Sequence, residues 1–250
     1  MLLQDKIAIV YGAGGSIGGA AARAFAREGA RVFLAGRTRA ALDKTAAAIR
    51  DAGGTAETAQ VDALDEGQVD AFAADVAGRA GGIDISFNAI GIQDVQKPLT
   101  ELSAADFLRP IEVAARTQFL TARAAVRHMT PRRSGVILMF GGGGPQTIPG
   151  VGGLKVALDA MESIRRQWAC EAGPYGIRVV TMVTGGIPES LPEDFADQEE
   201  LTAALTESTL LKRTASLADV GDVAAFVASD RARTMTSATV NISCGAIVDY

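Results

Sequence analysis

At 250 residues, with a formal net charge of −5, 48 % hydrophobic and 21 % charged residues, the chain fits one α/β domain with an extensive core and is not disordered. The acidic balance and the scattered lysines and arginines argue against a nucleic-acid partner, and no apolar run approaches the roughly 18 residues of a membrane helix. One histidine and two isolated cysteines offer no metal-ligand spacing, so we expect a metal-free cytoplasmic protein without a signal peptide.

Strand-like and helix-like segments alternate along the whole chain. In chain order we expect a strand at 7–10, a helix at 20–28, a strand at 31–35, a helix at 40–52, a strand at 56–61, a helix at 66–79, a strand at 83–87, a helix at 103–129, a strand at 135–140, a helix at 154–172, a strand at 177–183, a helix at 217–229 and a strand at 238–242. The continuous apolar strands indicate burial on both faces. The sequence therefore predicts a Rossmann-type, doubly wound α/β sheet of seven mostly parallel strands with helices on both faces.

The chain contains no internal repeat, low-complexity tract or interdomain linker, so we expect a single domain over residues 1–250. The least regular region is 185–209, which is rich in Pro, Glu and Asp. Long irregular segments at the end of a strand often cover a binding site. We expect residues 185–209 to form a lid on the substrate side.

A glycine cluster follows the first strand and opens the first helix. Glycines permit a tight turn and a close approach of the backbone to a pyrophosphate, while the helix N-terminus offers free N–H groups and partial positive charge. A glycine cluster alone could be a mere turn, but its place between a strand and a helix favours phosphate binding. We therefore expect the pyrophosphate of a dinucleotide to bind at Gly12, Gly14, Ser16, Ile17 and Gly18.

The ends of the second and third expected strands indicate which residues could contact the ribose and adenine of the dinucleotide. An NAD-preferring site usually places an acid at the end of the second strand, where this chain has Gly36-Arg37-Thr38. Gly36 leaves room, and Arg37 and Thr38 could hold a 2′-phosphate, so NADP(H) is favoured over NAD(H). The alternative is that Arg37 is a solvated arginine. Asp62, after the third strand, could accept a hydrogen bond from the adenine amino group.

At this point the chain resembles the short-chain dehydrogenase/reductase family. The glycine loop is similar to that family's Thr-Gly-x-x-x-Gly-x-Gly, with Tyr11 in place of threonine and Ser16 in place of the middle glycine. Further similar segments, in family order and spacing, are Phe87-Asn88-Ala89-Ile90-Gly91, Gly176-Ile177-Arg178-Val179-Val180 with Gly185-Gly186-Ile187, and 213–230 with Val240-Asn241-Ile242-Ser243-Cys244-Gly245. The resemblance covers almost all 250 residues and implies a nicotinamide dinucleotide with contacts from Asn88, Gly91, Gly185 and Ile187.

The same resemblance implies that most of the family's catalytic groups are missing. Ala114 stands where the family has a helix-borne asparagine, and a glycine run, Gly141 to Gly144, stands where its serine should follow the fifth strand. The Tyr-x-x-x-Lys site appears as Val151-Gly152-Gly153-Leu154-Lys155. Lys155 is then the surviving catalytic-site residue, and the resemblance implies that it binds the nicotinamide ribose. The alternative is an ordinary surface lysine.

Two classes of function follow from this pattern. The first is an NADP(H)-dependent oxidoreductase that transfers hydride to or from a small carbonyl, enone or imine/alcohol substrate with a non-standard proton donor. The second is a dinucleotide-binding protein without redox turnover, such as a sensor, a structural subunit, or a lyase or isomerase on the same fold. Candidate substitutes for the proton donor are Lys155, Gln146, Thr147, Gln93, Asp94 and Glu189, although Asp94 and Glu189 could equally be solvated loop carboxylates.

The resemblance also implies a homotetramer or homodimer. The family assembles through two long helices, which here are expected at 103–129 and 154–172. Phe119, Ile164 and Trp168 on those helices could belong either to the interface or to the core. The only other partner we expect is a small-molecule substrate, with no nucleic acid and no membrane.

Overall fold

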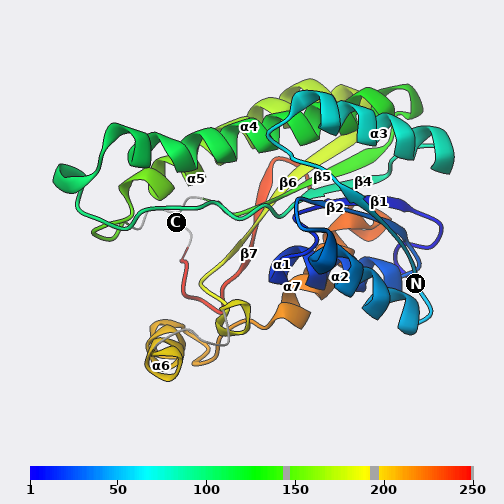
Figure 1. Cartoon of the computed structure of the whole chain (residues 1–250). Coiled ribbons are helices and arrows are strands. Elements are labelled where there is room, and N and C mark those ends of the chain that lie inside the picture. The colour runs from blue at the N-terminus through cyan, green and yellow to red at the C-terminus, as the bar shows by residue number, and fades with distance from the viewer. Residues whose placement is uncertain (143–146, 192–196, 249–250) are drawn as a thin grey trace.

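The protein is described from a computed structural model, for residues 1–142, 147–191 and 197–248. The described residues form a single sheet in the order β3-β2-β1-β4-β5-β6-β7, and every neighbouring pair is parallel (Figure 1). All seven predicted strands are present, each within two residues of its expected bounds. They are β1 (Ile7–Tyr11), β2 (Arg31–Gly36), β3 (Thr55–Gln60), β4 (Ile85–Asn88), β5 (Gly135–Phe140), β6 (Ile177–Thr184) and β7 (Ala238–Ile242).

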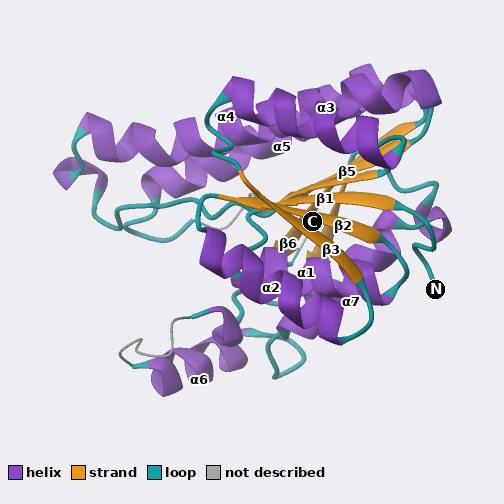
Figure 2. Ribbon diagram, turned by 45° about the vertical axis from the view of Figure 1, so that its right-hand side comes forward, coloured by secondary structure: helices purple, strands orange, loops and turns teal. Residues whose placement is uncertain are grey.

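Helices cover both faces of the sheet (Figure 2). On one face lie α1 (Ser16–Arg27), α2 (Arg39–Asp51) and α7 (Leu217–Ala228); on the other lie α3 (Glu66–Ala80), α4 (Ala104–Met129) and α5 (Gly152–Ala172). Successive strand residues point to opposite faces, so Val10 and Leu34 join the first core while Ile9 and Phe33 join the second. The doubly wound architecture predicted from the apolar strands is confirmed.

Local sequence explains where several helices begin and end. Asp65 caps α3 by accepting a hydrogen bond from the Gln68 N–H at 3.0 Å, and Gly81 ends the helix in the left-handed region at φ 85°. Ser216 and Asp219 form a reciprocal capping box at the start of α7. The first helix begins at Ser16, four residues before the predicted 20–28, because the glycine loop itself runs into the first helical turn.

One helix was not predicted. The helix α6 (Gln198–Ser208) lies within the expected lid region 185–209, and it stands apart from both helical layers in Figures 1 and 2. None of its residues, all of which are described, is buried. A helix without a buried face has no apolar periodicity, which is the signal that reveals the other helices in the sequence.

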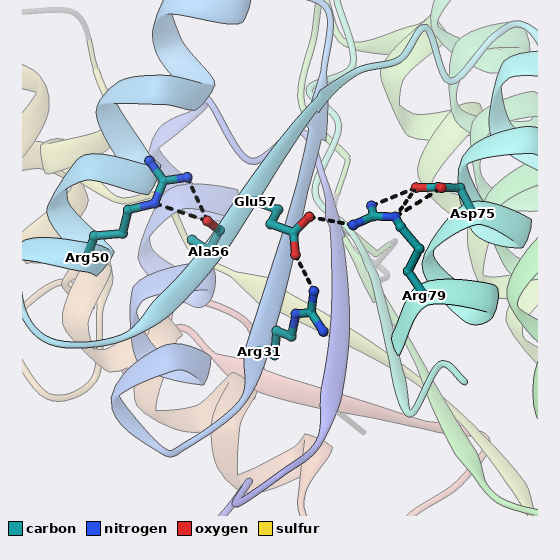
Figure 3. Close-up of polar contacts among 6 residues, drawn as sticks. All are labelled: Arg31, Arg50, Ala56, Glu57, Asp75 and Arg79. Carbon is teal, nitrogen blue, oxygen red and sulfur yellow. Dashed lines mark hydrogen bonds and ion pairs between the residues drawn. The ribbon is translucent and has the colours of Figure 1, made fainter. Parts of the chain in front are cut away.

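The edge strand β3 is fastened by a network of charged groups (Figure 3). The Glu57 carboxylate accepts hydrogen bonds from Arg31 on β2 and from Arg79 on α3, and Arg79 also binds Asp75 at 2.6 Å. The two guanidinium groups lie 5.0 and 5.5 Å from the ring centroid of Phe33. The bonds from Arg79 and then Arg31 hold the pKa of Glu57 below its usual value. This network ties β2, β3 and α3 together at the edge of the sheet.

Candidate active site

The strand order places a crevice between β1 and β4. The chain winds from β1 through β2 to β3 in one direction and from β4 to β7 in the other, so β1 and β4 mark the topological switch point. Ligands of doubly wound sheets bind beyond the carboxyl ends of the strands at this point. A cavity of about 470 Å³ lies there, lined by Tyr11, Gly12, Gly14, Gly15, Ala35, Gly36, Arg37, Thr38, Ala41, Leu42, Val61, Asp62, Ala63, Leu64, Ala89, Ile90, Gly91, Ile92, Gln93, Arg109, Val113 and Thr117.

The glycine loop is built so tightly that side chains would not fit. A Cβ on Gly18 would lie 2.4 Å from the Gly12 carbonyl oxygen, and a Cβ on Gly12 would lie 2.7 Å from the Ala89 carbonyl oxygen. Gly12 also has φ 77°, in the left-handed region that favours glycine. The N-cap of α1 is Gly15, which supplies no capping side chain. The loop therefore presents bare backbone at a helix N-terminus, which suits an anion.

The strand ends of β2 and β3 bring the predicted nucleotide groups to the same cavity. Arg37 and Thr38 both line it and are exposed, and the Arg37 carbonyl is held by a 3.0 Å hydrogen bond from the Gln60 amide. The Arg37 guanidinium forms no ion pair with any residue in the described ranges. Asp62 lines the cavity too, and one of its carboxylate oxygens accepts a hydrogen bond from the Leu64 N–H at 3.0 Å.

Other predicted cofactor residues lie next to the cavity or outside its lining. Asn88 is buried, where its amide donates to Thr121 Oγ1 at 3.1 Å and its oxygen accepts from the Ile90 N–H at 3.0 Å. It thus shapes the loop that contains Gly91, which does line the cavity. Ile187 is buried in the core beside α1, α2 and α7. The remaining predicted residues outside the lining are Ser16, Ile17, Gly18, Gly185 and Lys155.

Lys155 is engaged on its own helix. Its Nζ lies 2.6 and 2.8 Å from the two carboxylate oxygens of Asp159, one turn further along α5. Val151 is the N-cap residue of α5 and contributes no capping side chain.

The region between α4, α5 and the end of β4 is apolar. Ala114, Ala157 and Met161 form a buried cluster, against which Ile92, Ile111 and Leu158 pack. Gly141, directly after β5, approaches the same place: a Cβ there would lie 3.3 Å from Leu158 Cδ2. The α5 side chains in this cluster are therefore Ala157, Leu158 and Met161, all of them apolar.

The loop candidates for a proton donor have different surroundings. Glu189 accepts a 2.9 Å hydrogen bond from the Leu217 N–H at the start of α7, so its carboxylate has a structural partner. Asp94 Oδ2 is buried without a hydrogen-bond partner in the described chain. Gln93 lines the cavity, and Thr147 is exposed. Gln146, with Gly143 and Gly144 of the glycine run, lies outside the described residues.

Tyr11 lines the cavity but is a poor acid. Burial, with a smaller contribution from the negative charge of Asp70, raises the pKa of its phenol above the usual range. The ring packs edge-on against Phe72, with ring centroids 5.9 Å apart. Tyr11 therefore serves as part of the cavity wall.

Two groups of residues near the site were not predicted from the sequence. On α4, Arg109 precedes Val113 and Thr117 at helical spacing, and all three line the cavity. On α5, Glu162 and Arg165 form a buried ion pair at 2.9 Å, and Thr239 donates to the same Glu162 oxygen at 3.0 Å.

The other Glu162 oxygen is buried without a partner in the described residues. It lies 3.0 Å from where a Cβ of Gly142 would be. The only sign of this pair in the sequence is that Glu162 and Arg165 are three residues apart on one helix, next to Met161.

The described residues contain neither a candidate metal-binding cluster nor a candidate membrane-spanning helix. No group of three or more His, Cys, Asp or Glu side chains is placed to hold a metal ion in that part of the chain. No helix in the same ranges is long and apolar enough to cross a membrane.

Comparison with known proteins places the chain in a family. The family model described as enoyl-(acyl carrier protein) reductase matches residues 12–246. Levodione reductase of Leifsonia aquatica is 29 % identical, over 98 % of this chain and 96 % of its own length. L-rhamnose 1-dehydrogenase (NAD(P)(+)) of Azotobacter vinelandii is 32 % identical, over 100 % of this chain and 99 % of its own length. The crystal structure of NAD+-bound xylitol dehydrogenase superposes with a TM-score of 0.89 at 25 % identity, over 98 % of this chain and 100 % of that one.

The chain therefore belongs to the short-chain dehydrogenase/reductase family of oxidoreductases. This membership confirms the resemblance drawn from the glycine loop and the later motifs. The relatives are named as dehydrogenases and reductases, in agreement with the predicted class of enzyme.

Proposed function

We propose that the protein is an NADP(H)-dependent oxidoreductase. It would transfer hydride to or from a small carbonyl, enone or imine/alcohol substrate, with a proton route that differs from the family's tyrosine. The observation that carries this proposal is the cavity at the β1–β4 switch point. It combines a bare glycine loop with Arg37, which has no ion pair among the described residues. The match to named dehydrogenases and reductases supports it.

The residues present fit a nicotinamide dinucleotide. No side chain fits at Gly12 or Gly18, so a pyrophosphate could approach the backbone of the loop directly. Arg37 adds a positive charge to the lining of the same cavity. When bound, the cofactor would supply or accept the hydride. The residues that we propose hold it are Gly12, Gly14, Ser16, Ile17, Gly18, Arg37, Thr38, Asp62, Asn88, Gly91, Gly185, Ile187 and Lys155, the last of which would exchange its contact with Asp159 for the ribose.

The preference for NADP(H) rests on the end of β2. Gly36 leaves room, Arg37 can form a bidentate contact with a phosphate, and the lining carries no acid at this strand end. The two similar proteins differ in this respect, since the Azotobacter vinelandii dehydrogenase is named for NAD(P)(+) and the xylitol dehydrogenase is NAD+-bound. Arg37 is the residue on which we base the choice.

The atypical part of the proposal is the emptied acid–base site. Ala114, the glycine run Gly141 to Gly144 and Val151 occupy the positions that the resemblance assigns to polar catalytic groups, and the surroundings of Ala114 are apolar. Losing a positioned acid typically costs about 10²- to 10⁴-fold in rate. Holding two reactants in contact can still lower the barrier by about 7–11 kcal/mol, so hydride transfer remains feasible when the substrate needs little help with its proton.

A second function is favoured by the same apolar cluster. A dinucleotide-binding protein without redox turnover would keep the glycine loop and Arg37 and would have no use for an acid. Such a protein could be a sensor, a structural subunit, or a lyase or isomerase. Both functions require cofactor binding, and they differ in turnover.

Nicotinamide fluorescence separates the two functions. NADPH is titrated into the protein, and ketones, enones and imines are then added while NADPH oxidation is followed. Binding followed by oxidation supports the oxidoreductase, whereas binding without oxidation on the whole panel supports the second function. Failure of both NADPH and NADH to bind would exclude both.

Arg37→Ala tests the cofactor choice. Loss of a charge-assisted contact should weaken NADPH binding by about 10- to 100-fold and leave NADH nearly unchanged. Arg39→Ala is the matched control, because Arg39 is two residues away and is already paired with Asp43 at 2.9 Å. Equal losses for NADPH and NADH in Arg37→Ala would contradict the 2′-phosphate assignment.

We also propose a single domain over residues 1–250, with 185–209 as the substrate-side lid, a cytoplasmic location, and a homotetramer or homodimer formed through α4 and α5. Phe119 on α4 is 46 % exposed and stacks on Trp168 of α5 with ring centroids 6.1 Å apart. An exposed phenylalanine on one long helix, stacked on a partly buried tryptophan of the other, suits a subunit interface. Light scattering of the protein and of Phe119→Glu would test this assembly.

A further inference from the structure

We propose that Asp94 is the substrate-binding carboxylate of this site and that the substrate class is an iminium ion and its amine. This inference rests on the proposed oxidoreductase function and narrows it. It begins from the position of Asp94, which directly follows Gln93 in the loop after β4. Gln93 lines the cavity, as does Arg109, the neighbour of Pro110 on α4.

Asp94 is the residue next to the cavity-lining Gln93, and its carboxylate lies against the first turn of α5. A Cβ built on Gly153 would be 3.4 Å from Asp94 Oδ1 and 3.0 Å from Pro110 Cγ. Gly153 therefore leaves the space that the carboxylate occupies. The partial positive charge at the N-terminus of α5 stabilises a negative group in this position.

Within the described ranges, no group is paired with the Asp94 carboxylate. Asp94 Oδ2 is buried, and it accepts no hydrogen bond from the described part of the chain. A buried polar atom without a partner carries its full desolvation cost, which a ligand cation can offset. Glu189, the other loop carboxylate considered as a site residue, is bonded to the Leu217 N–H and lacks this property.

The surroundings increase the effect of a single charge. The neighbouring cluster of Ala114, Ala157 and Met161, with Ile92, Ile111 and Leu158, has no hydrogen-bonding side chain. In apolar surroundings a charge–charge contact is stronger than in water. Arg37 also lines the cavity, at the end of β2, where its charge matches the 2′-phosphate of the proposed cofactor. Arg109 of α4 is a second cation in the lining.

An iminium ion matches a site without an acid. Reduction of a ketone requires a hydride at carbon and a proton at oxygen, so it needs a donor. In an iminium ion the hydride and its electron pair form the new C–H bond, and the C=N π pair becomes the nitrogen lone pair. The product is a neutral amine, NADPH is oxidised to NADP+, and no proton is transferred. Asp94 would hold the cationic nitrogen until hydride transfer removes its charge.

The test compares matched ring compounds. The N-methylpyrrolinium ion is permanently cationic, and cyclopentanone is a neutral ring of similar size. With NADPH present, we expect the wild-type protein to reduce N-methylpyrrolinium and related cyclic iminium ions with kcat/KM at least about 10-fold above the matched ketones, because only the ketones need a proton donor.

Asp94→Asn tests the residue itself. It keeps the shape and removes the charge, so KM for the iminium ion should rise about 10- to 100-fold, as expected for a lost charge-assisted contact. The Kd of NADPH should not change, because the proposed contact of Asp94 is with the substrate and not with the cofactor. Glu171→Gln is the control for a carboxylate on α5 outside the site, where Glu171 is bonded to Gln167, and thermal unfolding checks that each variant is folded.

A second readout does not depend on turnover. N-methylpyrrolidinium, the protonated amine product, should quench or shift the fluorescence of the bound NADPH in the wild type and bind at least about 10-fold more weakly to Asp94→Asn. The role of Asp94 would be overturned if ketones and iminium ions were reduced with equal kcat/KM, or if the amine bound equally well to both proteins. Neither result would contradict the oxidoreductase function. Bound NADPH with no turnover of either class and no amine binding would overturn both.

Discussion

The two sides of the β1–β4 crevice contain very different kinds of residues. On the cofactor side, the backbone of Gly12 and Gly18 is fitted so closely that an added methyl group would collide with carbonyl oxygens. On the acid–base side, the cluster around Ala114 and Met161 is apolar, and Leu158 fills space next to Gly141. The comparison teaches that cofactor binding and proton chemistry are separable on one sheet, because different strand ends supply them.

The largest expected effect concerns the ion pair behind the acid–base side. In Glu162→Leu the Arg165 guanidinium would remain buried without its carboxylate partner. Removing one partner of a buried pair typically costs about 3–5 kcal/mol of unfolding free energy, which urea denaturation would measure. Glu171→Leu, on an exposed part of α5, is the control and should change stability by less than about 0.5 kcal/mol.

The NADPH affinity of Glu162→Leu shows to which side of the crevice Glu162 belongs. If Glu162 is structural, the folded fraction of Glu162→Leu should bind NADPH with unchanged affinity. A loss of NADPH affinity without a loss of stability would instead make Glu162 part of the cofactor side. Glu162→Gln, which keeps one hydrogen-bond acceptor, should lie between Glu162→Leu and the wild type in stability.

A smaller effect is expected on the cofactor side. Gly18→Ala places a Cβ 2.4 Å from the Gly12 carbonyl oxygen, so the loop must shift. Overpacking of this kind costs about 1–3 kcal/mol, which corresponds to about 5- to 150-fold in NADPH affinity if the strain falls on the bound conformation. Isothermal titration calorimetry would measure the change.

Gly78→Ala is the matched control for Gly18→Ala. Gly78 lies in α3, and a Cβ there would meet nothing within 4 Å. Alanine should raise helix stability by about 0.5–1 kcal/mol without changing cofactor affinity. Equal NADPH affinities in the two variants would mean that the tight glycine loop does not control binding.

The smallest effect lies at the β3 edge, far in sequence from the acid–base groups. Hydrogen bonds from Arg79 and Arg31 lower the pKa of Glu57, so its contribution to stability is present above the unfolded-state pKa and is lost as the pH falls through the folded-state pKa. The side chain is 35 % exposed, and solvent screening limits the contribution to about 1 kcal/mol or less.

Glu57→Gln tests this directly. Its stability should fall less than that of the wild type on acidification below neutral pH, as measured by urea denaturation at several pH values. Asp75→Asn is a comparison variant, because Asp75 shares Arg79 but is more exposed. Identical acid dependence in wild type and Glu57→Gln would exclude a role for this network in acid stability.

The sequence predicted the architecture because strands buried on both faces leave unbroken apolar runs. It missed α6, whose residues face solvent, and it placed the start of α1 too late because glycine hides a helix that begins in a phosphate loop. It also treated Asp94 and Glu189 alike. Only the fold brings Leu217 to Glu189 and leaves Asp94 Oδ2 without a partner.

The buried partners of a polar group are equally hidden in a sequence. Glu162 and Thr239 are far apart in the chain, and their contact depends on how α5 crosses β7. Lys155 illustrates the reverse case, because its spacing in the sequence predicts a ribose contact while its Nζ pairs with Asp159 on its own helix. Its role at the ribose remains a prediction.

The solvent-exposed helix α6 has a consequence for how such a protein can diversify. Because none of its residues contributes to the two cores, substitutions along Gln198–Ser208 carry little penalty in folding free energy. Selection can therefore vary this segment, and with it the lid that we propose for residues 185–209, more freely than the buried strands. An inherited fold with one freely mutable helix is a route by which one ancestral scaffold acquires many substrates.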